Sequence, residues 1–251
     1  MRITYETAAA PGRPSNEDFV IAGSTWVAVL DGATAPAGVD SGCRHDVPWL
    51  VAELGGALAG RLATRPEEGL PDLVADAIRA AMTAHAGTCD LTNPDSPSST
   101  VAVLRERGGL LDYLVLCDSP IALRHTDGTV QVVHDDRTDH LPGGRPYSLE
   151  LVRALRNRPG GFWVASTAPE AAYEALSGSV PSEKVTGVLL LTDGVTRLVE
   201  WYGHSWEQMT AVAATRGPAE LIAQVRREEL ERGTPHAAKP HDDATAVWLS
   251  W

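Results

Sequence analysis

The 251-residue sequence contains no apolar run of about 18 residues, the length that a membrane-spanning helix needs. We therefore expect no membrane span. The segment from Met1 to Glu6 also lacks the apolar core that is found in secretory signal peptides. Together these two absences predict a cytoplasmic protein.

Cysteine is scarce in this chain. The three cysteines stand at positions 43, 89 and 117, and no two of them form a C-x-x-C pair. An odd, widely spaced set of this kind is typical of reduced thiols in a cytoplasm. It does not favour a disulfide framework or a structural zinc site.

Positive charge is also limited, because 33 acidic residues outnumber 21 basic residues and give a formal net charge of −12. A protein of this charge is not expected to bind a nucleic-acid backbone or an anionic membrane. Some of the negative charge can instead serve as a ligand set for a divalent cation.

Several catalytic motifs are missing. The sequence has neither the G-x-S-x-G turn of serine hydrolases nor the G-x-x-x-x-G-K-[ST] loop of nucleotide-binding enzymes. Phosphatases with a nucleophilic aspartate need a second acid two residues further on, but Ala33 and Val195 stand at that interval after Asp31 and Asp193. These absences argue against all three classes.

Acidic residues do stand at the ends of short apolar runs. Three runs end on Asp31, Asp118 and Asp193, and Asp242 stands just ahead of the last run. Such runs indicate buried strands, and in an antiparallel sheet the end of one strand lies beside the start of its neighbour. We therefore expect the four carboxylates at one rim of one sheet, where they would repel one another unless a cation lay among them. Oxygen ligands without histidine or cysteine favour Mg²⁺ or Mn²⁺ over Zn²⁺.

The alternative explanation is that Asp-Gly is a common hairpin turn. It explains the pair at 127–128, where an alternating strand follows at once. It does not explain the pair at 31–32, which precedes a loop, or the pair at 193–194, which precedes a helical pattern. We favour metal ligands over turns at the latter two sites. For Asp118 and Asp242 both interpretations stay open.

A Pro-containing loop near the N-terminus carries a second possible site. Arg13 stands four residues ahead of the acid pair Glu17-Asp18. A guanidinium suits bidentate binding of a phosphoryl group, and the acids can hold metal-bound water. Taken alone, the loop is better explained as a solvated segment with scattered charges.

Strand-like and helix-like segments occur in blocks along the chain. Strands are expected over 3–5, 18–22, 26–30, 100–104, 110–117, 121–126, 129–133, 188–192 and 244–249. Helices are expected over 50–62, from Pro71, over 149–156, from Pro169 to Gly178, over 195–200, after a Ser205 capping box, and from Pro218 to Gly233. With no repeat or long linker, the pattern predicts one α+β domain over residues 1–251, with antiparallel sheets covered by helices.

Six segments, in this order, resemble the successive motifs of the metal-dependent type 2C serine/threonine protein phosphatases (the PPM family) in their bacterial form. They are RPSNED at 13–18, VAVLDG at 27–32, SST at 98–100, LVLCDS at 114–119, LLLTDG at 189–194 and DDATAVWL at 242–249. Each is weak alone, but six in order over nearly the whole chain are specific. The resemblance implies a four-layer α-β-β-α sandwich of two antiparallel sheets flanked by helix pairs. It also implies a signalling hydrolase that needs Mn²⁺ or Mg²⁺.

The resemblance also implies residue roles. The implied metal ligands are Glu17, Asp31, the carbonyl of Gly32, Asp118, Asp193 and Asp242. Asp31 would bridge two ions, a hydroxide between the ions would attack phosphorus, and Arg13 would bind the substrate phosphate. Asp31, Asp193 and Asp242 are therefore the implied catalytic residues. The implied partner is a phosphoprotein, such as the substrate of a kinase, and the sequence indicates no oligomeric state.

The sequence departs from the family pattern at several positions. Arg197 stands where the family often has another acid, and Cys117 and Pro120 replace residues of the motif around 118, which argues against a third ion. Ala33 replaces a histidine proposed as general acid in animal members. Residues 143–185 match poorly and are the candidate for substrate selection. These departures support an alternative, a weakly active or inactive phosphatase-like regulatory or binding module, although the core acids are retained.

Overall fold

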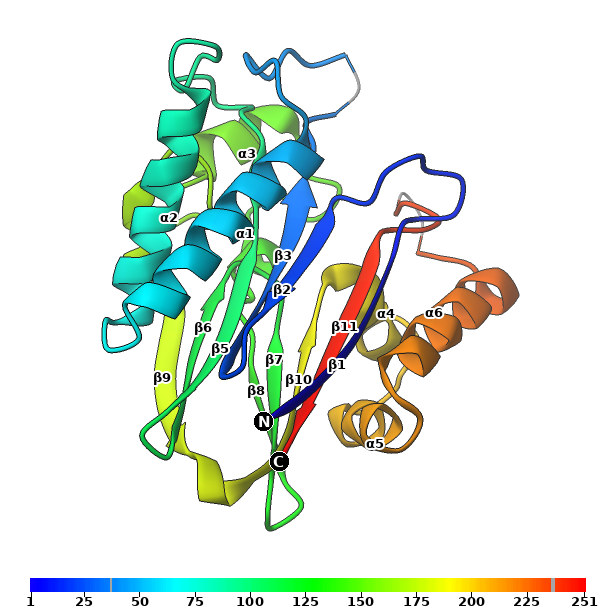
Figure 1. Cartoon of the computed structure of the whole chain (residues 1–251). Helices are drawn as coiled ribbons and strands as arrows, with labels where there is room; N and C mark the ends of the chain where they lie inside the picture. Colours follow the sequence, from blue (N-terminus) through cyan, green and yellow to red (C-terminus); the bar gives the residue numbers. More distant parts are fainter. Residues whose placement is uncertain (37, 236–237) are drawn as a thin grey trace.

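Two antiparallel sheets stack face to face, and helices cover both outer faces (Figure 1). This arrangement is seen in a computed structural model that describes residues 1–36, 38–235 and 238–251. It confirms the predicted α+β sandwich of four layers. No helix among the described residues combines the length and the apolar character needed to cross a bilayer.

The first sheet has five strands. In spatial order they are β1 (Arg2–Ala8), β11 (Ala244–Ser250), β10 (Val185–Leu191), β7 (Ile121–His125) and β8 (Val130–Val133). The second sheet has six. Its main order is β2 (Asp18–Ala22), β3 (Trp26–Ala33), β5 (Val101–Arg107), β6 (Leu110–Leu116) and β9 (Leu176–Pro181), and β4 (Ser98–Ser99) pairs with β3.

Two groups of helices enclose the sheets (Figure 1). The second sheet is covered by α1 (Val47–Thr64) and α2 (Leu70–His85). The first sheet is covered by α4 (Asp193–Glu200), α5 (Trp206–Arg216) and α6 (Pro218–Arg232). A shorter helix, α3 (Leu149–Leu155), follows the 3₁₀ turn Arg137–His140, and two more 3₁₀ turns span Pro169–Glu174 and Ser182–Lys184.

The strands are apolar on both faces because each sheet is buried on both sides. In β3, Val27 and Val29 face the other sheet, whereas Ala28 and Leu30 pack under the helices. All four side chains have no exposed surface. This burial explains why the strand reads as a continuous apolar run rather than as an alternating pattern.

Local signals in the sequence agree with the structure at several elements. The four leucines predicted at every fourth residue, from 50 to 62, are buried along one side of α1. Ser205 and Gln208 form the predicted capping box at the start of α5, with both reciprocal hydrogen bonds present. The hairpin predicted at 127–128 is also confirmed between β7 and β8.

The helix predicted from Pro169 to Gly178 is wrong. The chain forms only a 3₁₀ turn over Pro169–Glu174 and then enters edge strand β9, which pairs with β6. The segment 177–181, with its Gly178 and terminal Pro181, offers little helix propensity. A Cβ on Gly178 would lie 2.4 Å from the hydroxyl oxygen of Tyr113, so the Tyr113 side chain covers this glycine and would have to shift for a larger residue.

The first and last strands lie side by side. Arg2 pairs with Ser250 at one end of the two strands, and Ala8 pairs with Ala244 at the other. Both termini therefore lie at one end of the sandwich, as Figure 1 shows. The opposite end, where β3 and β10 finish, carries the acidic residues described below.

Candidate metal centre

The acids that end the apolar runs come from both sheets. Asp31 lies within β3, where it pairs with Asp18 of β2, and Asp118 follows β6. Asp193 is the first residue of α4, just after β10, and Asp242 precedes β11. The expectation of one rim of a single sheet is therefore wrong. The stacked sheets bring two rims together at the same end of the sandwich.

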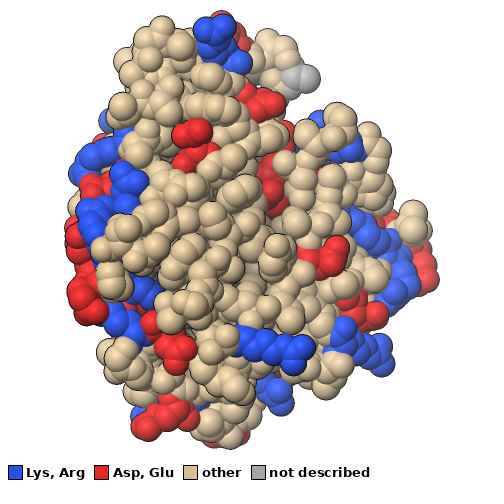
Figure 2. All heavy atoms as spheres, viewed as in Figure 1, with Lys and Arg blue, Asp and Glu red and all other residues tan. Residues whose placement is uncertain are grey.

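These acids share one cleft of about 280 Å³. Asp31, Asp118, Asp193 and Asp242 all line it. The backbone N–H of Asp193 donates to Oδ2 of Asp31 over 3.4 Å, which joins the two sheets directly. Figure 2 shows acidic atoms in a hollow at the end of the molecule where β3 finishes.

The N-terminal loop borders the cleft from one side. The carboxylate of Glu17 accepts a 2.7 Å hydrogen bond from the hydroxyl of Thr34, which lines the cleft. The amide of Glu17 donates to Asp243 over 2.6 Å. Neither Glu17 nor the exposed Arg13 is among the described residues that form the cleft wall. The predicted set therefore divides into four acids and Gly32 inside the cleft and two residues on an adjacent loop.

Both Asp-Gly pairs are sites of close packing rather than turns. A Cβ on Gly32, inside β3, would lie 2.2 Å from Val47 Cγ1 and 2.6 Å from the carbonyl oxygen of Glu17. A Cβ on Gly194, in the first turn of α4, would lie 1.8 Å from the carbonyl oxygen of Asp243. Glycine is required at each position because neighbouring backbone comes too close for a side chain. This geometry confirms that neither pair is a hairpin turn.

Ionisation of the acids in and beside the cleft is disfavoured by burial and by their mutual repulsion. Burial, together with the charges of Asp193 and Asp18, raises the pKa of Asp31 well above its usual range. Asp193 keeps contact with solvent at the mouth of the cleft, but desolvation on its other sides and the charge of Asp242 raise its pKa to about 7. Burial raises the pKa of Asp18 to about 8, although hydrogen bonds from Thr245 and Thr192 oppose this shift.

The donor set fits a hard cation. One carboxylate oxygen of Asp18, Oδ1, is buried without a hydrogen-bond partner, and such atoms in a native site call for an ion or a water. Carboxylate oxygens are the ligands that Mg²⁺ and Mn²⁺ prefer. Among the described residues, no three acids bring one oxygen each within 4.8 Å of one another. Binding of one ion by three of these acids would therefore require their side chains to move inward.

Two basic side chains already contact one of the acids. Arg197 Nη2 lies 3.2 Å from Oδ2 of Asp242, and Lys239 Nζ lies 3.3 Å from the same carboxylate. Arg197 is buried and also pairs with Glu229 of α6 over 2.6 Å. Its guanidinium lies 4.5 Å from the centroid of the Trp201 ring. Asp242 is therefore partly neutralised by the protein itself.

Sequence reasoning missed part of this network. It identified Arg197 only as a departure from the family pattern, and it did not identify Lys239 or Glu229. It also missed Thr100, whose hydroxyl accepts from the backbone N–H of Asp31 over 3.1 Å. The one available signal was the SST motif at 98–100, which gave no role for its last residue.

The segment 143–185 forms one wall of the cleft. Leu149, Val152, Phe162 and Val164 supply apolar side chains to it. Arg156, on the same wall, donates to the carbonyl oxygen of Ser96 and to the hydroxyl of Ser166. Burial lowers the pKa of Arg156 to about 10. The segment 143–185 therefore supplies both apolar side chains and a partly buried cation to the cleft that holds the acids.

Comparison with known proteins gives a consistent result. A sequence profile described as Protein phosphatase 2C matches residues 15–230. No curated protein sequence matches the chain. Similar solved structures include the PPM Ser-Thr phosphatase MsPP from Mycobacterium smegmatis in complex with cacodylate. It is 17% identical, with 100% of this chain and 98% of that chain covered and a TM-score of 0.62.

Two structures of the serine/threonine phosphatase PstP are also similar. The catalytic domain of PstP in complex with two manganese ions is 19% identical, with 99% of this chain and 97% of that chain covered and a TM-score of 0.61. PstP/Ppp from Mycobacterium tuberculosis is 18% identical, with the same coverage and a TM-score of 0.62. At these identities the structural likeness supports the fold alone.

Proposed function

Because the chain belongs to the protein phosphatase 2C family, we propose that it hydrolyses phosphoserine and phosphothreonine monoesters in a phosphoprotein. Membership in this family supports a metal-dependent phosphatase activity. The observation that carries the proposal for this chain is that Asp31, Asp118, Asp193 and Asp242 line one cleft. Residues from two separate sheets meet there, and a purely structural role does not explain their crowding.

The proposed metal ligands are Glu17, Asp31, the carbonyl of Gly32, Asp118, Asp193 and Asp242. When bound, a pair of Mn²⁺ or Mg²⁺ ions polarises phosphoryl oxygens and lowers the pKa of water to give a nucleophile at neutral pH. The protein holds the central acid in place through its backbone. Thr100 accepts from the amide of Asp31, and the amide of Thr100 donates to the carbonyl oxygen of Asp31 over 2.9 Å.

Asp18 has a supporting role in this proposal. It pairs with Asp31 across β2 and β3, and one of its oxygens accepts from the hydroxyls of Thr192 and Thr245. These two bonds fix the carboxylate between the two sheets. Its other oxygen is buried without a partner and can accept a hydrogen bond from a bound water.

Metal dependence is the direct test of the proposal. Metal-free protein is expected to leave an aryl phosphate and a phosphothreonine peptide intact, and added Mn²⁺ or Mg²⁺ is expected to start phosphate release. EDTA should abolish the reaction, and excess Mn²⁺ should restore it. The measurement is phosphate release against metal concentration. Wild-type protein that stays folded and inert with both metals on both substrates would contradict the enzyme assignment.

Arg13 is proposed to bind the substrate phosphate. It lies on the exposed loop between β1 and β2, near Glu17, at the end of the sandwich that carries the acids. Arg13→Ala should raise KM for an aryl phosphate several-fold and change kcat less, because a guanidinium contributes mainly to binding of the phosphoryl group. Arg216→Ala, at the exposed end of α5, is the control. An unchanged KM for Arg13→Ala would remove this role.

One observation favours the alternative, a phosphatase-like module that binds a partner without turnover. Arg197 and Lys239 both contact Asp242, so this carboxylate has less negative charge to offer a cation. Phosphate release measured against metal concentration separates the two functions. A binding module would bind a phosphopeptide, measured by calorimetry, and would release no phosphate at any metal concentration.

A further inference from the structure

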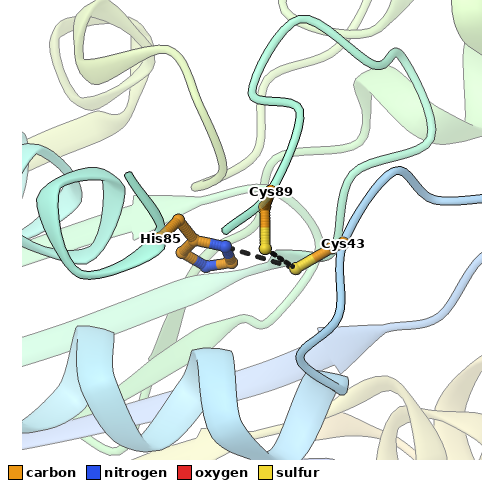
Figure 3. A group of neighbouring side chains, drawn as sticks. All are labelled: Cys43, His85 and Cys89. Carbon is orange, nitrogen blue, oxygen red and sulfur yellow. Dashed lines mark hydrogen bonds between the residues drawn. The ribbon is translucent and has the colours of Figure 1, made fainter. Parts of the chain in front are cut away.

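Three side chains that the proposed phosphatase chemistry does not use converge near the start of α1 and the end of α2. Figure 3 shows Cys43, His85 and Cys89 pointing toward one another. The Sγ atom of Cys43 lies 2.9 Å from Sγ of Cys89 and 3.3 Å from Nδ1 of His85. One ligand atom from each residue lies within 4.8 Å of both others. It is the only such group of three among the described residues.

The backbone around these side chains is tightly held. The amide of Cys89 donates to the carbonyl oxygen of His85, the last residue of α2, over 3.2 Å. The amide of Asp90 donates to the carbonyl oxygen of Gly42, next to Cys43, over 2.8 Å. These bonds fix the spacing between the segment before α1 and the segment after α2. The three side chains therefore meet because of the fold and not because of flexible loops.

His85 itself is held in a defined orientation. It is buried, and its ring packs edge-on against Trp49 of α1 with 4.5 Å between centroids. The His45 ring stacks on the Trp49 ring at 3.9 Å between centroids and lies edge-on to the His85 ring at 5.5 Å. A fixed imidazole beside two thiols is a preorganised ligand set. His45 stands close enough to supply a fourth ligand after a rotation of its side chain.

We propose that Cys43, His85 and Cys89 bind a Zn²⁺ ion. Two sulfur ligands and one imidazole nitrogen are the donor set that selects Zn²⁺ over the hard cations expected in the acidic cleft. The fourth tetrahedral position is open to His45 or to a water molecule. Each cysteine binds as a thiolate and releases its proton to solvent.

Zinc binding requires a small local movement. Two thiolates on a tetrahedral Zn²⁺, each about 2.3 Å from the ion, lie roughly 3.8 Å apart. The two sulfurs now lie 2.9 Å apart, so they must separate by about 1 Å, given that geometry. Rotation of the Cys43 side chain on its loop can provide this, because the cysteine is only half-buried.

The ion would join two segments that form the wall of the acidic cleft. The segment before α1 contributes Thr34 to the cleft, and the segment after α2 contributes Pro94 and Ser96. A side chain already links them, since Asn93 donates to the carbonyl oxygen of Asp40 over 3.1 Å. Zinc at this position would hold the cleft wall in one conformation. The ion itself would not contact the catalytic acids.

The test is zinc content combined with cobalt spectroscopy on the 251-residue chain. Protein purified without chelator and desalted should hold about one tightly bound zinc per chain by elemental analysis, as structural zinc sites do. Co²⁺ exchanged into the site should give a thiolate-to-cobalt charge-transfer band in the near ultraviolet. Cys117 also lines the acidic cleft, so the band should persist in Cys117→Ser, which assigns it to Cys43 and Cys89.

Variants supply the second arm. Cys89→Ser and Cys43→Ser should each weaken zinc affinity by more than about 100-fold. Loss of a residue that only orients a metal ligand costs about 10–100-fold, and these two residues bind the ion directly. His85→Asn should do the same, whereas His125→Asn, on the distant β7–β8 hairpin, should bind zinc like the wild type. Circular dichroism checks that each variant is folded. Cobalt binding by the wild type tests the site even if a variant fails to fold.

Three results would overturn the proposal. One is wild-type protein that takes up no zinc at micromolar concentration and loses two titratable thiols to a Cys43–Cys89 disulfide in air. Another is a cobalt spectrum without a thiolate band. The third is zinc retained at wild-type affinity in Cys89→Ser. None of these results bears on phosphate release, so the phosphatase proposal stands or falls separately.

Discussion

Asp31→Asn is expected to reduce kcat/KM for an aryl phosphate by at least about 100-fold, since even residues that only orient a metal ligand contribute about 10–100-fold. Asp31 lies close to four other acids. The charges of Asp193, Asp18, Asp118 and Asp242 all raise its pKa. Removing its charge therefore removes the centre of the proposed ligand set. Steady-state kinetics over a range of Mn²⁺ concentrations measures the loss.

The same substitution should stabilise the metal-free protein. An ionised carboxylate buried among other acids destabilises the folded state, and asparagine keeps an oxygen that can accept from the amide of Asp193. The thermal midpoint of Asp31→Asn in EDTA should therefore exceed that of the wild type. Asp127→Asn, in the exposed hairpin turn, is the matched control for both measurements. Wild-type kinetics in Asp31→Asn would contradict the proposed mechanism.

Asp112→Ala is expected to lower the free energy of unfolding by about 3–5 kcal/mol, because it leaves a buried charge without its partner. Asp112 lies 2.8 Å from Arg105, and the two side chains are 7% and 3% exposed. Ser179 of β9 donates to the same carboxylate over 2.6 Å. Asp112 lies in β6, and these two contacts link it to β5 and β9 at the side of the sheet farthest from β2.

Urea denaturation monitored by circular dichroism measures this change. Asp76→Ala, which removes a half-exposed partner of Arg65 and Arg79, is the control and should shift the midpoint little. An equally small shift for Asp112→Ala would mean that Arg105 finds another partner.

The stabilisation from Asp112 should also depend on pH. Burial favours its neutral form, but hydrogen bonds from Ser179 and Arg105 outweigh burial and lower the pKa of the folded-state carboxyl. The unfolded chain has an ordinary aspartate pKa of about 3.9. The stabilisation is therefore fully present above about pH 4 and is lost as the pH falls through the folded-state pKa. The difference in stability between wild type and Asp112→Ala should shrink over that range.

Much of the scaffold could be predicted because its strands are buried on both faces and its helices have clear ends. The apolar run from 26 to 30 and the leucines of α1 each identify one element without knowledge of the rest. The acids could be located for the same reason, since each stands at the end of such a run. Which sheet each acid belongs to could not be predicted, because strand order depends on pairings between residues distant in the chain. Asp31 and Asp193, for example, are 162 residues apart.

Features that depend on tertiary contact escaped prediction. Cys43 and Cys89 are 46 residues apart, and only the packing of α1 against α2 brings them together with His85. Strand β9 also gave no local signal, because its glycine and serines fit a strand only where β6 provides the pairing. Arg197 looked like a loss of function by sequence alone, but it is a buried ion-pair partner of Glu229.

The adjacency of β1 and β11 has a practical consequence for the experiments proposed above. Because Arg2 and Ser250 are paired neighbours at the end of the sandwich remote from the acidic cleft, an affinity tag, a fluorophore or a surface tether can be attached at either extremity without obstructing substrate access. A single tethered orientation would then present the open cleft to solution, which suits surface-based measurement of phosphopeptide capture.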